Sequence, residues 1–160
     1  MLWSRRSFLL LLPVSACGFT PAFGTKGPAE ELLGTVRATD PTDKNGFDFV
    51  QHIEERLGRP TTPVYDLTYS IATNPIGVGI TPDGATTRYN LTGTLTWALT
   101  RKADQKRMAG GSFGTFTSYS ATGSTVAGLT AQTDASLRLM RLFADDVVAR
   151  LVAASPGFPA

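Results

Sequence analysis

The longest alternating pattern in the sequence runs from Tyr89 to Thr100, where large side chains take every second position. One set is Tyr89, Leu91, Gly93, Leu95, Trp97 and Leu99, and the intervening set is Asn90, Thr92, Thr94, Thr96, Ala98 and Thr100. Because successive side chains of a β-strand point to opposite sides of a sheet, the pattern predicts a strand with one apolar face. That face must be covered by another layer of the fold.

Further strands and two helices are predicted around this segment. The expected strands are 33–38, 65–71 continuing as 76–80 beyond a bend at Asn74-Pro75, and 112–120, where Gly110, Gly111 and Gly114 suggest a bulge or a close backbone approach. A helix is expected over 46–57, with Asn45 as N-cap and Gly58 after its end. A second helix is expected over 132–154, with an apolar stripe of Leu139, Leu142, Phe143, Val147 and Leu151.

The order of these elements is strand, helix, three strands in a meander, helix. We therefore expect an α+β fold in which two helices pack on one face of a four-stranded mixed sheet. The first strand–helix–strand unit is compatible with a right-handed crossover. Residues 33–160 form this domain, and the Pro- and Gly-rich residues 17–32 form a flexible tether before it.

The first sixteen residues have the pattern of an export signal. Arg5 and Arg6 precede an apolar run, Phe8 to Leu12, which ends in Pro13 and small residues. That run is far shorter than the roughly 20 residues that a membrane-spanning helix needs. A buried core strand is the alternative, and the flanking arginines and small residues argue against it. Ser4 to Leu9 also resembles a twin-arginine motif, so both export routes stay open.

The only cysteine of the chain, Cys17, follows this segment directly. Val14-Ser15-Ala16-Cys17 resembles the bacterial lipobox, in which the cysteine thiolate takes a diacylglyceryl group and the signal is cut just before it. The resemblance implies cleavage between Ala16 and Cys17 and a membrane anchor of more than one acyl chain. Gly18, where inner-membrane retention signals carry aspartate, favours the outer membrane.

Composition argues against several classes of function. The chain has 15 Lys+Arg against 13 Asp+Glu, and removal of Arg5 and Arg6 with the signal leaves 13 of each, whereas a nucleic-acid-binding domain is usually more basic. One cysteine and one histidine, His52, are too few for a structural zinc site. We find no nucleophile–base pair, and Asp145 and Asp146 are adjacent and diverge on a helix. The sequence therefore predicts a protein that is not an enzyme and binds no metal.

A cluster of cations lies between two predicted strands. The segment 101–107 reads RKADQKR, so a hairpin tip there would present Arg101, Lys102, Lys106 and Arg107 against a single Asp104. Such clusters suit phosphate and carboxylate groups, although an ordinary solvated turn is the alternative. Arg88 would add to the cluster if it lay on the same side of the sheet.

Two segments of the chain carry short motifs that go beyond the lipobox. The first is Cys17-Gly18-Phe19-Thr20-Pro21-Ala22-Phe23-Gly24, and the second is the last predicted helix, with its polar start at Gln132-Thr133-Asp134-Ala135 and with Leu139, Leu142, Ala144, Asp145-Asp146 and Arg150-Leu151. Together they resemble the LptE family of lipopolysaccharide-assembly lipoproteins, whose opening is C-G-F-x-P-x-Y-G; Phe23 stands here where tyrosine is common.

This resemblance implies two helices on a four-stranded sheet and a role without catalysis. The protein would be an outer-membrane lipoprotein facing the periplasm and the lumen of the β-barrel LptD, as its plug and assembly factor. It would need no cofactor beyond the lipid on Cys17, and it would contact lipopolysaccharide through basic residues, matched here to Arg101, Lys102, Lys106 and Arg107. Two alternatives stay open: an auxiliary lipoprotein of an ABC-type lipid-transport system, and a periplasmic enzyme exported by the twin-arginine route.

Overall fold

The structure is a computed structural model that describes residues 21–24, 27 and 29–158. The predicted signal peptide, its cleavage point and Cys17 lie outside these residues. Elements within them follow the chain in the order η2 (Glu30–Leu32), β1 (Val36–Ala38), α1 (Lys44–Leu57), β2 (Tyr65–Ile80), β3 (Thr86–Arg101), β4 (Arg107–Ser120), α2 (Thr125–Ala154) and η3 (Ser155–Gly157).

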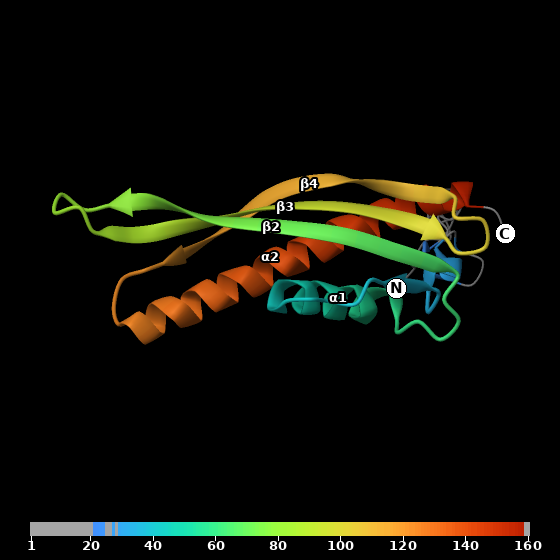
Figure 1. Cartoon of the computed structure of the whole chain (residues 1–160), viewed down its shortest axis with the longest axis horizontal. Helices are drawn as coiled ribbons and strands as arrows, with labels where there is room; N and C mark the ends of the chain where they lie inside the picture. Colours follow the sequence, from blue (N-terminus) through green and yellow to red (C-terminus); the bar gives the residue numbers. More distant parts are fainter. Residues whose placement is uncertain (1–20, 25–26, 28, 159–160) are drawn as a thin grey trace, which may run out of the picture.

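The four strands form one mixed sheet in the order β1-β2-β3-β4. β1 runs parallel to β2, and the two later pairs are antiparallel. Both helices lie against the same face of the sheet (Figure 1). The predicted fold class and the order of elements are therefore confirmed.

The core lies between that face and the two helices. The residues predicted to face inward from β3 are buried there, including Leu91, Leu95, Trp97 and Leu99. α2 packs tightly on Gly93, where an added Cβ would lie 2.8 Å from Phe143 Cζ and 2.9 Å from Leu139 Cδ2. Because Gly93 has no side chain, α2 can pack directly on the backbone of β3.

α1 begins two residues earlier than the sequence predicted, and the predicted N-cap was wrong. Asp43, not Asn45, is the N-cap: its Oδ1 accepts a hydrogen bond of 2.7 Å from the Gly46 amide. Asn45 instead accepts a bond of 2.6 Å from the Ser136 hydroxyl of α2. Either residue type can cap a helix, so the choice depends on a contact with α2 that lies 91 residues away in the chain.

α2 begins at Thr125, with Ser124 as N-cap, seven residues before the predicted start at Gln132. The added turns contain Gly128 and the β-branched Thr125, Val126 and Thr130, which have low helix propensity, so the pattern gave no helix signal there. The predicted stripe holds except at Leu142, which is 44% exposed while Leu139, Phe143, Val147 and Leu151 are fully buried.

β2 continues through Asn74 and Pro75, where the sequence suggested a bend; its irregularity lies at Gly77–Gly79. The amide of Thr39 donates to the Leu67 carbonyl across the β1 side of β2. The backbone groups of every second residue in a strand face the same neighbouring strand. Pro75 is eight residues after Leu67, so its nitrogen also faces the β1 side of β2. β1 pairs only with Tyr65–Leu67, so no ladder bond is lost at Pro75.

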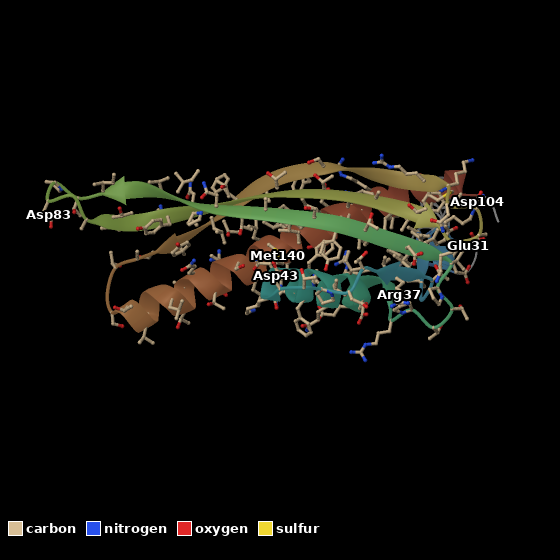
Figure 2. All side chains as sticks on the ribbon, viewed as in Figure 1. Glu31, Arg37, Asp43, Asp83, Asp104 and Met140 are labelled. Atoms are coloured by element: carbon tan, nitrogen blue, oxygen red, sulfur yellow. The ribbon has the colours of Figure 1, made fainter. Side chains whose placement is uncertain are left out.

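Two other strand boundaries differ from the prediction. β1 begins at Val36 rather than at residue 33, because the preceding residues turn out of η2. β4 begins at Arg107 rather than at residue 112, and its irregular pairing lies opposite Leu99 and Thr100 rather than at the glycines. The two hairpin tips lie at opposite ends of the molecule, with Asp83 at one and Asp104 at the other (Figure 2).

Candidate functional site

The β3–β4 hairpin is held in shape by one of its predicted binding residues. Arg101 makes a two-pronged bond to Asp104, with Nε 3.0 Å from Oδ1 and Nη2 2.8 Å from Oδ2. Asp104 Oδ1 also accepts from the Lys106 amide at 3.3 Å. The turn closes through Gln105, whose φ of 57° lies in the left-handed region. Arg101 therefore stabilises the turn through Asp104, and its predicted contact with a ligand stays a prediction.

The other three predicted residues are exposed and make no ion pair with any described residue. We call Lys102, Lys106 and Arg107 the basic tip. A Cβ on Gly110 would meet the Arg107 guanidinium, so the absence of a side chain there leaves room for Arg107 over β4. Since Asp104 neutralises Arg101, the basic tip supplies three unpaired positive charges. Such a set can bind phosphate or carboxylate oxygens.

The ion pair at this turn changes the titration of its carboxylate. The hydrogen bonds from Arg101 hold the pKa of Asp104 at about 2, against an ordinary value of 3.8. The same pairing raises the pKa of Arg101. Both side chains therefore stay charged across physiological pH, and the shape of the basic tip does not depend on pH in that range.

The basic tip lies at the end of the molecule where the described chain begins. Glu31 and Asp104 are both at this end in Figure 2. The Lys102 amide donates to the Val64 carbonyl at 2.9 Å, which ties the hairpin to the start of β2. Arg88 does not join the cluster: it pairs with Gly79 and Ser120 near the Asp83 end of β3.

The face of the sheet away from the helices is polar but uncharged along most of its length. Its side chains from the three long strands include Thr68, Ser70, Asn74, Asn90, Thr92, Thr94, Thr96, Thr100, Ser112 and Ser118. Several bond one another or the backbone, as Ser118 does to Asn90 at 2.7 Å. Phe116 is the large apolar exception on β4, at 56% exposed.

His52 is a link between the helices. Its Nδ1 lies 2.9 Å from Glu55, and its Nε2 lies 3.5 Å from Asp145 of α2, which is also 3.5 Å from Arg56. The bond from His52 lowers the pKa of Glu55. Asp146 pairs separately with Arg150 at 2.7 Å, so the two aspartates diverge as predicted.

Neither a metal centre nor a membrane-crossing helix stands out in the described part of the chain. Its His, Cys, Asp and Glu side chains nowhere gather in a group of three that could hold a metal ion. The helices in residues 29–158 are too short or too polar to cross a membrane.

Comparison with known proteins defines the class. A family model for lipopolysaccharide assembly matches residues 33–151, from before β1 almost to the end of α2. Among curated protein sequences, none matches this chain. The chain belongs to the LptE family.

Solved structures share the fold. A protein described as a lipoprotein of Caulobacter crescentus is 20% identical with a TM-score of 0.68, and the match covers 82% of this chain and 98% of that one. The rare lipoprotein B of Shewanella oneidensis is 10% identical with a TM-score of 0.59, covering 77% and 96%. A minor lipoprotein of Acinetobacter baumannii is 11% identical with a TM-score of 0.52, covering 74% and 91%. At these identities the likeness concerns the fold.

Proposed function

We propose that this chain is an outer-membrane lipoprotein, anchored through lipid on Cys17, that partners the β-barrel LptD in lipopolysaccharide transport to the outer leaflet. It acts as plug and assembly factor, without catalysis of its own and without a cofactor beyond that lipid. The observation that carries the proposal is the family match over residues 33–151. Relatives of the same fold that are described as lipoproteins support the anchor.

The surface chemistry supports a place inside a barrel. The inner wall of a large transmembrane barrel is polar. The outward hydroxyl-rich face of β2, β3 and β4 can exchange hydrogen bonds with such a wall along most of its length, where it carries no charge. The basic tip, at the end of the molecule that also holds Glu31, would contact phosphate or carboxylate groups of lipopolysaccharide.

The test is a pull-down of the tagged, lipidated protein from detergent-solubilised outer membrane, with partners identified by mass. We expect a stoichiometric large β-barrel. An inner-membrane transporter in its place would refute the proposed partner.

A Cys17→Ala variant tests the anchor separately, because a thioether to lipid cannot form on alanine. It should leave a folded chain that no longer fractionates with membranes. Membrane attachment equal to that of the unmodified chain would exclude Cys17 as the anchor.

A further inference from the structure

β4 forms one edge of the sheet (Figure 1). The Ala121 amide donates to the Thr87 carbonyl of β3, and the pairing of β4 with β3 is regular from residue 109 to residue 120. The orientation of backbone groups alternates along a strand. The odd-numbered residues of this part of β4 therefore bond β3, and the even-numbered residues point their N–H and C=O groups away from the sheet.

Four of these outward residues form an exposed run whose outward groups bond no described residue: Gly110, Ser112, Gly114 and Phe116. We call residues 110–116 the open run. It ends before Ser118, whose carbonyl accepts a hydrogen bond of 3.2 Å from Arg138 of α2. Residues 108–120 contain no charged side chain and no proline. The open run can therefore accept another strand along its whole length.

The other long edge of the sheet is protected against such pairing. The outer side of β2 is free beyond Leu67, because β1 pairs only with Tyr65–Leu67. Pro75 on that side has no N–H to give to an added strand, which is one way in which natural proteins block an edge. β4 has no such residue in its open run. An uncharged edge without proline is a template for pairing with another chain.

The open run is complementary to a second copy of itself. Its midpoint is Phe113, so two copies paired antiparallel about that residue use every outward group of both runs. In this register Phe116 of one copy lies opposite Gly110 of the other, and Ser112 lies opposite Gly114. A large side chain thus faces a residue without one at both ends of the pairing, as when an aromatic ring covers a glycine at a sheet edge.

α2 gives a reason for a whole second copy rather than an isolated peptide strand. Leu142 of this helix is 44% exposed. Four residues before it, Arg138 bonds Ser118, and eight residues after it, the Arg150 guanidinium lies 6.0 Å from the centre of the Phe113 ring. Since residues four apart share a face of a helix, Leu142 borders the open run on the helix side of the sheet. A second copy brings its own α2 to that side, whereas a peptide brings no helix layer.

The charges beside the open run do not oppose this approach. Arg138 is paired with Asp134 at 3.0 Å, and Arg150 is paired with Asp146 at 2.7 Å. The guanidinium of Arg107 lies over the glycine that the aromatic ring of the other copy would cover. The face of an aromatic ring attracts a cation, so this contact is favourable as well.

We propose that the free chain forms a symmetric dimer, in which two β4 strands pair antiparallel about Phe113 and join the two four-stranded sheets into one. Pairing over residues 110–116 gives a small interface, so the dimer is weak, with a dissociation constant in the micromolar range. The dimer is a property of the chain outside any complex and does not rest on the proposed function.

The test is sedimentation velocity of the purified full-length chain in detergent over a wide range of protein concentration. Hydrogen exchange at backbone amides is followed by NMR on the same samples. We expect a monomer to give way to a dimer as concentration rises, while exchange at the Ser112 and Gly114 amides slows in step. The Phe113 amide, which faces β3, is the internal reference and should not change.

Two pairs of variants test the strand. Gly114→Pro removes an N–H that the chain itself does not use, and symmetry removes two bonds from the dimer, so it should weaken the dimer about tenfold or more. Thr73→Pro makes the same change at the free edge of β2 and should have no effect. Phe116→Ser should weaken the dimer about threefold to tenfold, because its ring covers a glycine at both ends. Phe47→Ser removes an equally exposed ring, 57% against 56%, from α1 and should have no effect.

Each outcome decides the proposal. A chain that stays monomeric at every concentration refutes the dimer. A dimer as strong in Gly114→Pro and Phe116→Ser as in the unmodified chain refutes pairing through β4. If the Ser112 and Gly114 amides exchange rapidly in the free chain and slowly only with the co-purified barrel, the open run belongs to the barrel and not to a second copy. The pull-down of the barrel is a separate measurement, so the proposed function stands or fails independently.

Discussion

Gly93→Ala tests how tightly α2 packs on β3. The new methyl carbon would lie 2.8 Å from Phe143 Cζ and 2.9 Å from Leu139 Cδ2, which is closer than carbon atoms approach in proteins. Phe143 and Leu139 are fully buried, so neither can turn away into solvent. Overpacking of this kind lowers the free energy of unfolding by about 1–3 kcal/mol. Replacing a strand glycine by alanine raises it by about 0.5–1 kcal/mol, because alanine loses less conformational entropy on folding. The expected net loss in the free energy of unfolding is about 0.5–2 kcal/mol.

The assay is thermal unfolding of the purified protein followed by circular dichroism. For a domain of this size the loss corresponds to a fall in Tm of about 2–8 °C. Gly114→Ala is the matched control, because the neighbouring strand offers its Cβ only ordinary contacts, the nearest 3.8 Å away. Its Tm should be unchanged or slightly higher. Phe143→Leu in the Gly93→Ala background should recover part of the loss. A Gly93→Ala variant as stable as the unmodified protein would refute the close-packing argument.

Three further predictions concern the helix cap and the β3–β4 hairpin. Asp43→Ala should lower the free energy of unfolding by about 1 kcal/mol in denaturant titration, whereas Asp43→Asn, which can still accept from the Gly46 amide, should cost much less. The Asp104 carboxyl should titrate by NMR near pH 2. Because its pKa is lowered on folding, the stabilisation from its bond to Arg101 is complete above about pH 4 and is lost as pH falls through 2. A midpoint near 3.8 would show that the pair does not form in solution. Charge reversal of the basic tip should weaken lipopolysaccharide binding in a sedimentation assay with little change in Tm, since its residues make no ion pair with described residues. Unchanged binding would show that the basic tip is an ordinary solvated turn.

The sequence predicted those parts of the fold in which local pattern and tertiary packing agree. β3 is the clearest example, because its alternation directly reflects one buried face and one solvated face. α2 from Gln132 onward follows for the same reason. The first turns of α2 could not be predicted, since Gly128 and the β-branched residues there are poor helix formers. The continuity of β2 through Pro75 depends on the shortness of β1, which no local pattern reveals.

At the β3–β4 hairpin the sequence predicted a cluster of cations but not the ion pair within it. The four cations of the β3–β4 hairpin do lie at one end of the molecule. Arg101, however, is held by Asp104, and the three-residue spacing of these opposite charges was the one sequence signal for that pair.

The length of β3 sets the distance between the two hairpin turns. It is a single strand of 16 residues between two hairpin turns, and at about 3.3 Å per residue it spans about 53 Å. The hydrocarbon layer of a bilayer is only about 30 Å thick. With its Asp104 end at one boundary of that layer and its length along the membrane normal, β3 would therefore carry the Asp83 turn well past the opposite boundary. The same strand connects both turns, so their separation is set by the length of β3.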